Sequence, residues 1–494
     1  MKSKTQLPAH IGIIHFIGIG GIGMSGIAEV LATHGYKIQG SDLKQSKIIE
    51  RLQNIGIKVF LTQEAKNLRS VDVVVVSSAI GINNLELITA QAKNIPVVSR
   101  AEMLAELMRM KSNVSVAGTH GKTTTTTMIA ALLDYGGLDP TVINGGIINA
   151  YGSNARIGIG DWMVVEADES DGSFLKLPST ISVVTNIDPE HLEYYGSFEA
   201  LKEAFFRFLS NIPFYGLAVL CADDKDILGL IKKVNNRRIV TFGLNEGADL
   251  RAKNIVYKNN NTEFDIEFLD GSRHIKNLNF PMVGEHNILN VLAAVAVARH
   301  LRVEDSDIRK GLMEFKGVGR RFTNLGTIKN VTIIDDYAHH PTEIKATLKA
   351  AKQSSNGRVL AVHQPHRFSR LSNLFDEFSN CFDDADIIGI TPIFAAGESI
   401  IADVTSEKLI SRLSVNYSKP VIKIEDEKSL LSFVITHAKP NDIVVLMGAG
   451  SISSWANNLV VELTSVSYTH LRAHETPEHL GWRGVGEKKK GGGG

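Results

Sequence analysis

The stretch SNVSVAGTHGKTTTTTMIAALL, residues 112–133, places a glycine turn between an apolar strand and a helix rich in Thr and Ala. A turn that ends in Gly121, Lys122 and Thr123 at a helix start offers backbone N–H groups and an ammonium to phosphates, and a hydroxyl to Mg²⁺. The loop is a variant, because Val116 stands where the usual GxxxxGK[ST] pattern has its first glycine. Since a strand precedes the loop and a helix follows it, the stretch predicts ATP binding. The residues expected to contact ATP here are Gly118, Thr119, His120, Gly121, Lys122, Thr123 and Thr124.

A second glycine loop lies close to the N-terminus, again between an expected strand and an expected helix. Gly18, Gly20 and Gly23 form the pattern GxGxxG, and Asp42 follows Gly23 by 19 residues. Such glycines let the backbone approach a pyrophosphate, and the acid can bind a ribose hydroxyl. The pattern predicts a diphosphate ligand without naming its carrier. NAD, a UDP-sugar and other nucleotide diphosphates all satisfy it, and so does a turn that binds nothing.

Acidic side chains follow two further apolar runs, 162–165 and 181–185, which we expect to be strands. Parallel strands end at the same edge of a sheet, so these carboxylates are expected beside the phosphate loop, where Mg²⁺ would bind. The alternatives are an acidic turn in solvent and, for His191, a surface or packed histidine. The residues concerned are Glu166, Asp168, Glu169, Asp171, Asp188, Glu190 and His191.

Further polar motifs follow in the second half of the chain. Two Asp and two His within residues 335–340 suggest a transition-metal site, but we expect none, because adjacent side chains at a strand end usually diverge. Arg367 and Arg370 follow an expected strand at 359–363, where two guanidinium groups can bind a carboxylate or a phosphate, or simply face solvent. The other residues of these motifs are Gly284, His286, Asn287, Asn290, Gly317, Arg320, Arg321, Tyr337, His363 and His366.

Length and composition exclude several classes of protein. A chain of 494 residues corresponds to about three domains. Its 53 Lys and Arg residues balance 53 Asp and Glu, so no long-range positive field favours nucleic acid or an anionic membrane. Two cysteines cannot make a disulfide framework, which favours a reducing compartment. Residues 1–28 superficially resemble a signal peptide, but glycines interrupt their apolar part and no other apolar run reaches membrane-helix length, so we expect a cytoplasmic protein.

Alternating strand and helix patterns predict an α/β fold with mostly parallel sheets. Short alternating runs between residues 237 and 280 predict a small antiparallel part in the middle of the chain. Residues 465–494 show no apolar period and end in three lysines and four glycines, so we expect a disordered or foreign tail. The predicted domains are 1–111, 112–321 and 322–464.

Together these motifs resemble the Mur ligase family, and most closely its branch that adds L-alanine. The resemblance covers roughly residues 10–464 and is far more specific than any single motif. A lysine that is carbamoylated in sister ligases is absent here, where residues 204–207 read AFFR, and the alanine-adding branch shares this absence. The matching runs are GIGGIGMSG at 18–26, AGTHGKTTT at 117–125, EADESD at 166–171, DDYAHHP at 335–341 and HQPHR at 363–367.

The resemblance implies an N-terminal Rossmann-like domain that binds a UDP-sugar, a central P-loop ATPase-like domain, and a C-terminal Rossmann-like domain that brings the amino acid. It implies a ligase that joins L-alanine to the lactyl carboxylate of UDP-N-acetylmuramate through an acyl phosphate. The implied reaction consumes ATP with Mg²⁺ in cytoplasmic peptidoglycan synthesis. We expect a monomer or a homodimer without a nucleic-acid or membrane partner.

The resemblance also assigns roles to matching positions in this sequence. The residues that take part in catalysis and in binding alanine would be Lys122, Glu166, His191, Tyr337, His339, Arg367 and Arg370. The magnesium ligands would be Thr123, Glu166 and His191. Besides the phosphate loop, ATP would contact His286, Asn287, Asn290, Arg320 and Asp336. The UDP-sugar would contact Gly18, Gly20, Gly21, Gly23, Asp42 and Ser77.

Three other interpretations stay open at this point. A related ligase that attaches a preformed tripeptide to the same acceptor would carry the same motifs. An NAD-dependent oxidoreductase is suggested by GxGxxG with Asp42. A regulator that binds a nucleotide without catalysis would also need the phosphate loop, but it would form no amide.

Overall fold

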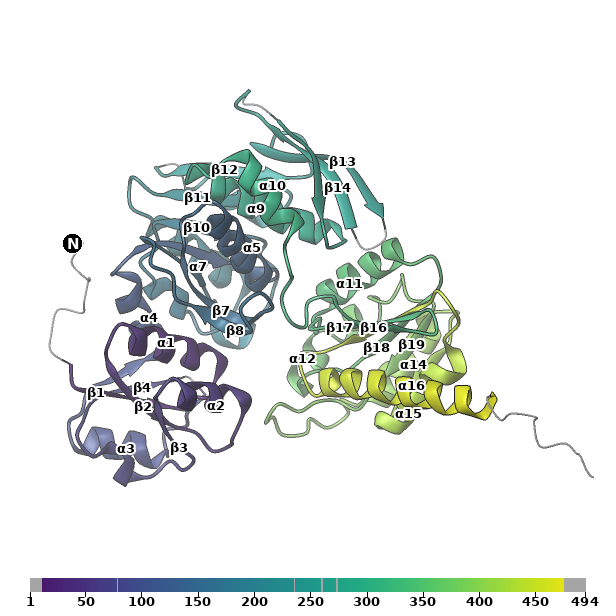
Figure 1. Cartoon of the computed structure of the whole chain (residues 1–494), viewed down its shortest axis with the longest axis horizontal. Helices are drawn as coiled ribbons and strands as arrows, with labels where there is room; N and C mark the ends of the chain where they lie inside the picture. The colour runs from purple at the N-terminus through teal and green to yellow at the C-terminus, as the bar shows by residue number, and fades with distance from the viewer. Residues whose placement is uncertain (1–10, 78, 235, 259–260, 272–273, 475–494) are drawn as a thin grey trace, which may run out of the picture. The chain divides into compact units, whose positions relative to one another are not determined.

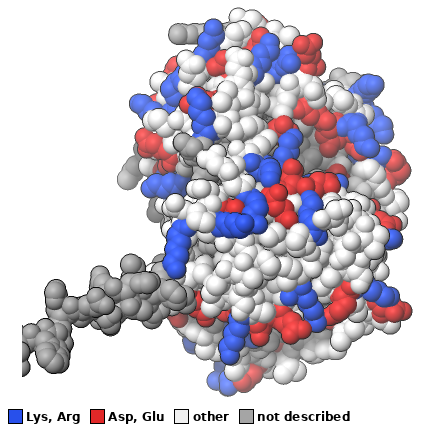
Figure 2. Space-filling model, turned by 90° about the vertical axis from the view of Figure 1, so that its right-hand side faces the viewer, with Lys and Arg blue, Asp and Glu red and all other residues white. Residues whose placement is uncertain are grey.

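The computed structural model describes most of the chain. The described residues are 11–474 except 78, 235, 259–260 and 272–273. No helix in this described part combines the length and the apolar character that crossing a bilayer requires. Lys and Arg side chains are interspersed with Asp and Glu on the face shown in Figure 2.

The end of the fold differs from the prediction. Helix α16 (Ile452–His474) continues through the first ten residues of the expected tail. Residues 465–474 hold no Gly or Pro that would end a helix, although their apolar period is lost. The rest of the predicted tail, 475–494, lies outside the described residues.

Contacts divide the chain into two compact units. The first comprises Met1–Thr323 with Asp336–Asn356, and the second comprises Asn324–Asp335 with Gly357–Gly494. Two sheets lie in the first unit and a third lies in the second (Figure 1). The predicted α/β class, with mostly parallel sheets and a small antiparallel part, is confirmed. The domain boundaries near residues 111 and 321 stay a prediction.

The N-terminal sheet has five parallel strands. They are β1 (Ile13–Ile17), β2 (Lys37–Ser41), β3 (Lys58–Phe60), β4 (Val71–Val76) and β5 (Val97–Ser99). Their order is β3-β2-β1-β4-β5, so the chain leaves the central β1 on one side for β2 and later crosses to β4 on the other. The carboxyl end of β1 is therefore the switch point at which such sheets bind ligands. The accompanying helices are α1 (Ile22–Thr33), α2 (Lys47–Asn54), η1 (Ala65–Leu68), α3 (Leu85–Ala92) and α4 (Arg100–Met108).

The central sheet has ten strands. They are β6 (Ser112–Ala117), β7 (Thr141–Ile148), β8 (Ser153–Arg156), β9 (Trp162–Glu166), β10 (Ile181–Val184), β11 (Leu217–Cys221), β12 (Arg238–Gly243), β13 (Leu250–Lys258), β14 (Asn261–Phe268) and β15 (Ile275–Phe280). Their order is β15-β14-β13-β12-β11-β10-β6-β9-β7-β8. Among the described strands of this sheet, antiparallel pairing joins β13 to β14, β14 to β15, and the unpredicted edge strand β8 to β7. Strand β12, which the sequence placed in the antiparallel part, instead pairs in parallel with both neighbours, because orientation depends on the partner strand and not on a strand's own pattern.

Two helices bring polar groups to the carboxyl edge of this sheet. Helix α9 (Glu285–His300) is buried along most of its length, because its Ala and Val residues let α5 (Lys122–Tyr135) and the sheet approach closely. Asn287 and Asn290 are the polar exceptions near the start of α9. The other helices here are η2 (Ser173–Lys176), α6 (Leu192–Tyr195), α7 (Phe198–Ser210), α8 (Lys225–Ile231) and α10 (Asp305–Met313).

The second unit is built on a sheet of six strands. They are β16 (Thr323–Ile328), β17 (Val331–Asp336), β18 (Val359–His363), β19 (Ile387–Ile390), β20 (Val421–Lys423) and β21 (Ile443–Met447), in the order β16-β17-β21-β18-β19-β20. Helix α11 (Pro341–Ser354) lies between β17 and β18 in sequence, but its contacts group it with the first unit. The remaining helices are α12 (Phe368–Asn373), α13 (Phe375–Phe378), α14 (Ser406–Asn416), α15 (Glu427–His437) and α16.

Candidate active site

The phosphate loop connects β6 to α5 and depends on two glycines. Gly118 has φ +131° and Gly121 has φ +83°, a backbone region that other residues rarely adopt. A Cβ on Gly118 would lie 2.1 Å from Thr185 Oγ1, and one on Gly121 would lie 2.7 Å from Asn290 Oδ1. Asn186 fixes the turn between them, because its side-chain oxygen accepts the N–H of His120 at 2.8 Å. The loop therefore packs directly against the segment after β10 and the start of α9.

Lys122 is held by its own loop and by a buried acid. Its Nζ lies 2.7 Å from Gly118 O, 3.1 Å from Thr119 O and 2.9 Å from Glu169 Oε1. Burial disfavours the ammonium, yet the carboxylates of Glu169 and Asp168 outweigh it and raise the pKa of Lys122 above its usual value. A phosphate bound in the loop would compete with Glu169 for this ammonium. The structure thus places a positive charge where the sequence predicted phosphates.

Among the acidic residues that follow β9, Glu169 is the most deeply buried. Its side chain is 1% exposed, and burial raises its pKa to about 7. Its Oε2 has no hydrogen-bond partner among the described residues. His191 Nε2 approaches the other oxygen at 4.0 Å. Sequence reasoning grouped Glu169 with its acidic neighbours, and only the fold shows that it lies between Lys122 and His191.

Thr123 and Glu166, two of the predicted magnesium ligands, lie on either side of a glycine pair in β7. Gly145 donates its N–H to Glu166 Oε2 at 2.8 Å, and a Cβ on Gly146 would lie 2.9 Å from Thr123 Cγ2. Within the described ranges no three His, Cys, Asp or Glu side chains form a metal-binding group by themselves. A hydroxyl and carboxylates, with an unpartnered Glu169 oxygen nearby, are the oxygen donors that suit Mg²⁺ when phosphate and water complete its shell.

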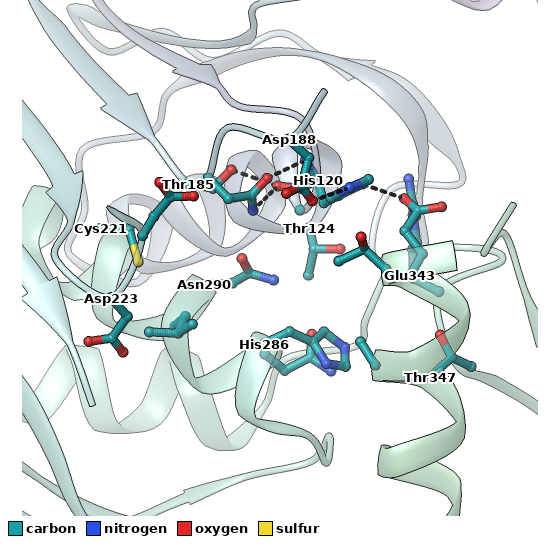
Figure 3. A pocket seen from close by; sticks show the side chains of 18 of the residues that line it. His120, Thr124, Thr185, Asp188, Cys221, Asp223, His286, Asn290, Glu343 and Thr347 are labelled. Atoms are coloured by element: carbon teal, nitrogen blue, oxygen red, sulfur yellow. Dashed lines mark hydrogen bonds and ion pairs between the residues drawn. The ribbon is translucent and has the colours of Figure 1, made fainter. Parts of the chain in front are cut away.

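A cavity of about 330 Å³ opens beside the phosphate loop (Figure 3). Burial lowers the pKa of His286, on its wall, to about 4, so this ring is neutral at physiological pH. Apolar side chains from β11, β12 and the segment before α9 face amides from α9 across the space, a composition that suits a purine base. The lining includes Gly121, Thr124, Cys221, Asp223, Phe242, Met282, His286, Asn287, Asn290, Arg321, Asp336, Glu343 and Thr347.

The cavity lining lacks some of the predicted ATP contacts, namely Gly118, Thr119, Lys122 and Thr123 of the phosphate loop and Arg320. Arg321 lines it, whereas Arg320 is not among its lining residues, and the guanidinium carbons of both lie within about 5 Å of the Tyr337 ring centre. Arg320 has φ +62° and Phe322 has φ +50°. These left-handed residues turn the chain so that neighbouring side chains point in different directions. The wall residues Cys221, Phe242 and Met282 come from separate elements, and no local pattern marked them.

Asp336 organises the chain on the far wall of this cavity. Its Oδ2 accepts the N–H of Phe322 at 2.7 Å, and its Oδ1 accepts from Ala338 N at 2.8 Å and Thr347 Oγ1 at 3.1 Å. Burial raises its pKa. Asp336 therefore ties α11 to the 320–322 segment, and its predicted contact with the nucleotide stays a prediction.

His120 projects from the phosphate loop toward two carboxylates. Its Nε2 lies 2.9 Å from Asp188 Oδ2 and its Nδ1 lies 3.3 Å from Glu343 Oε1 (Figure 3). Burial alone would lower the pKa of His120, but its hydrogen bonds to Asp188 and Glu343 raise it to about 10. The imidazolium is thus the stable form in the folded protein at neutral pH.

This histidine predicts a pH dependence of stability. Because its pKa is higher folded, near 10, than its ordinary 6.5, its stabilising contribution is complete below pH 6.5 and is lost as the pH rises toward 10. We expect the difference in unfolding free energy between the wild type and His120→Ala to shrink over that range. Urea titrations of both proteins measure it, and a constant difference would contradict the ion pairs.

The N-terminal glycine loop is closed by its own acid. Asp42 Oδ2 accepts the N–H of Gly20 at 2.9 Å, and its Oδ1 accepts the N–H of Leu43 at 2.7 Å. The carboxylate therefore holds the turn, and its predicted contact with a ribose hydroxyl stays a prediction. Gly21, with extended backbone, is the N-cap of α1, so the start of that helix faces the loop as predicted for a diphosphate site.

Arg100 is a residue that sequence reasoning missed. It begins α4, and its Nη1 lies 2.6 Å from where a Cβ on Gly23 would stand. Its Nη2 lies 3.6 Å from Asp168 Oδ2. A cavity of about 320 Å³ lies beside it and is also lined by Ser77 and Lys176. The available signal was its position directly after a strand, but β5 has only three residues and no readable period.

We expect Arg100→Met to weaken binding of the nucleotide that occupies the N-terminal glycine loop by about 10- to 100-fold, because it removes the cation beside that loop. Isothermal titration with a UDP-sugar measures the loss. Arg109→Met is the control, since Arg109 ends the same helix and pairs with Glu106 on the surface. Equal affinities in all three proteins would contradict a role for Arg100 in this loop.

Arg367 and Arg370 belong to the second unit. Arg367, with φ +70°, precedes α12, and Arg370 Nη1 lies 3.1 Å from His366 Nδ1. His363 is fully buried at the end of β18, with its ring 5.6 Å from that of Phe378, so it packs in the core of this unit. Binding of the amino acid by these two arginines stays a prediction.

Models of one protein family match three segments of the chain. Residues 13–112 match the "Mur ligase family, catalytic domain", residues 116–298 the "Mur ligase middle domain", and residues 320–450 the "Mur ligase, glutamate ligase domain".

Individual proteins match over nearly the whole chain. A UDP-N-acetylmuramate–L-alanine ligase of Dinoroseobacter shibae is 59% identical over 459 residues, covering 93% of this chain and 99% of that protein. The enzyme of the same name from Paracoccus denitrificans is 56% identical over 472 residues, covering 94% and 99%. The solved UDP-N-acetylmuramate-alanine ligase of Thermotoga maritima has a TM-score of 0.78 at 28% identity, covering 92% and 100%. A murein peptide ligase of Psychrobacter arcticus shares the fold, with a TM-score of 0.67 at 23% identity, covering 92% and 98%.

Proposed function

The chain belongs to the Mur ligase family, and from that premise we propose that it joins L-alanine to the lactyl carboxylate of UDP-N-acetylmuramate, converting ATP to ADP and phosphate. The chain is thus an enzyme, a ligase of peptidoglycan precursor synthesis. Relatives with this activity in their names match 93–94% of it. The resemblance inferred from the sequence motifs is confirmed by these matches.

One observation carries the proposal: contacts connect the two glycine loops. Arg100 lies against Gly23 of the first loop and 3.6 Å from Asp168. The next residue, Glu169, lies 2.9 Å from Lys122 of the second loop. A diphosphate on one loop and a triphosphate on the other would therefore lie on either side of one acidic segment. That arrangement suits transfer of a phosphoryl group from one ligand to the other.

Phosphoryl transfer activates the acceptor. A carboxylate is a poor acylating agent, because its leaving group would be oxide. An oxygen of the lactyl carboxylate therefore attacks the γ-phosphorus of ATP, the bond to the β-phosphate oxygen breaks, and ADP leaves. Lys122 would balance the charge on the equatorial oxygens, and in-line positioning by the loop supplies much of the acceleration.

Amide formation consumes the acyl phosphate. The amine of L-alanine attacks the acyl carbon and loses a proton, and phosphate leaves with the electrons of the broken bond. Water has to be excluded from the activated acyl group. We assign the binding of L-alanine and of the acyl phosphate to Tyr337, His339, Arg367 and Arg370. The His339 ring is held for such a role, with Nδ1 2.9 Å from Tyr337 O and 3.3 Å from Glu343 Oε2.

Thr123, Glu166 and His191 would hold Mg²⁺, with Glu169 as a further carboxylate nearby. Bound Mg²⁺ supplies charge neutralisation on the phosphate oxygens. A cytoplasmic location, and a monomer or homodimer, complete the proposal as predictions from the sequence.

Product analysis tests the function. The purified protein is incubated with ATP, Mg²⁺, UDP-N-acetylmuramate and a mixture of amino acids, and the products are identified by mass spectrometry. We expect the L-alanyl amide as the main product and ADP release that requires the sugar nucleotide. ADP release that is independent of the sugar nucleotide, with no amide, would favour a regulator that binds and hydrolyses ATP.

The tripeptide-adding ligase is the nearest alternative. L-Alanine is favoured because relatives named as L-alanine ligases match at 56–59% identity over nearly the whole chain. Competition between L-alanine and the tripeptide, compared as kcat/KM, separates the two activities. We expect L-alanine to be strongly preferred, and a preference for the tripeptide would reassign the substrate.

A further inference from the structure

Glu343 contacts the start of α11, the phosphate loop and Arg321. Its Oε2 accepts the N–H of His339 at 3.0 Å and of His340 at 3.3 Å, which caps the first turn of α11. Its Oε1 lies 3.3 Å from His120 Nδ1 and 3.7 Å from Arg321 Nη1. One carboxylate therefore joins the start of α11 to the phosphate loop.

The rings of His120 and His340 reinforce this connection. Their centres lie 5.0 Å apart, and His340 Nδ1 accepts the N–H of Thr342. On the loop side, Asp188 holds the other nitrogen of His120 and donates its own N–H to Thr119 Oγ1 at 2.9 Å. The histidine is thus fixed from both directions, and its side chain is 12% exposed.

His120 and Glu343 both line one cavity, where they lie side by side although they come from different elements. The phosphate loop, the first turn of α5 and α9 contribute Gly121, Thr124 and Asn290, while α11 contributes Glu343 and Thr347 (Figure 3). A change in the distance between the loop and α11 would change the width of this space. The His120–Glu343 contact joins the phosphate loop to α11 where both border the cavity.

We propose that His120 and Glu343 are a positioning pair for ATP: their contact holds α11 against the phosphate loop and so sets the cavity that receives the nucleotide. The inference rests on the proposed function for the identity of the nucleotide. Neither residue is assigned a chemical step. Removing either member is expected to affect ATP binding and to leave the N-terminal glycine loop and its ligand unaffected.

A double-mutant cycle tests the pair. Equilibrium binding of ATP with Mg²⁺, without acceptor or amino acid, is measured for the wild type, His120→Ala, Glu343→Gln and the double variant. Each single change is expected to weaken ATP binding by about 10-fold, and the double change by no more than about the same factor, because one contact is lost in all three. UDP-N-acetylmuramate binding is expected to stay unchanged.

Lys349→Met is the matched control. Lys349 lies on the same helix and pairs with Glu285 of α9 at 2.8 Å, outside the cavity lining. It is expected to keep wild-type ATP affinity, and a loss equal to that of Glu343→Gln would overturn the proposal in favour of general docking of α11. If Glu343→Gln fails to fold because the helix cap is lost, His120→Ala carries the test, since it leaves the cap in place.

Wild-type ATP affinity in His120→Ala, or losses that multiply in the double variant, would overturn the proposal. Failure of the proposed function looks different. The wild type would then form no L-alanyl amide, whereas the coupling between the two residues in ATP binding would still be measured. The two failures are therefore distinguishable.

Discussion

Replacing Lys122 with Ala is expected to abolish amide formation while leaving the affinity for UDP-N-acetylmuramate intact. The Lys122 ammonium lies at the phosphate loop, 2.9 Å from Glu169 Oε1. Its loss removes the charge that offsets the transferring phosphoryl group, so kcat should fall by at least about 10³-fold. Amide formation and calorimetric binding of the sugar nucleotide measure the two effects separately.

The matched control is Lys202→Ala. Lys202 lies on α7 and pairs with Glu199 and Asp226. Turnover of this variant should equal that of the wild type. Full activity in Lys122→Ala would remove the assignment of the phosphate loop to ATP.

Gly118→Ala is expected to have the second large effect. A Cβ there would lie 2.1 Å from Thr185 Oγ1 and 3.0 Å from Thr185 N, at a φ of +131° that Ala rarely adopts. The loop or the segment after β10 has to move, so Lys122 loses its position. We expect ATP binding to weaken by at least about 100-fold, because a displaced loop loses several charge-assisted hydrogen bonds to the phosphates.

Gly137→Ala is the control that separates the steric clash expected in Gly118→Ala from the backbone strain common to both variants. Gly137 also has a left-handed φ, +73°, but a Cβ there would meet nothing within 4 Å. This control should lose about 1 kcal/mol of stability and keep its ATP affinity. Equal ATP affinities in the two glycine variants would contradict the packing described for the loop.

The fold was predictable wherever a strand or helix carried a period of its own. Strands β6 and β18 are apolar runs bounded by polar residues, and both were expected from sequence. Strands β3 and β5 were missed, whereas β20, which also has three residues, was expected from its apolar run at 421–424. The parallel orientation of β12 was missed because it depends on β11 and β13, which lie elsewhere in the sequence.

The residues of the candidate site were likewise predictable where their signal is local in sequence, and were not where it depends on the fold. The phosphate loop was predictable because its glycines and Lys122 are contiguous and their chemistry is local. Arg100 was not, because its importance arises from Gly23 and Asp168, which only the fold brings to it. Asp42 was found by its spacing, but its hydrogen bond to Gly20 depends on a backbone geometry that spacing does not report.

Isotope transfer tests most directly whether the ligands of the two loops react with each other. UDP-N-acetylmuramate labelled with ¹⁸O in its lactyl carboxylate is converted with ATP and L-alanine, and the released phosphate is analysed by mass spectrometry. Attack of the carboxylate on the γ-phosphorus predicts one ¹⁸O in each phosphate and the other in the amide. Phosphate without ¹⁸O, formed together with the amide, would contradict direct transfer between the two ligands.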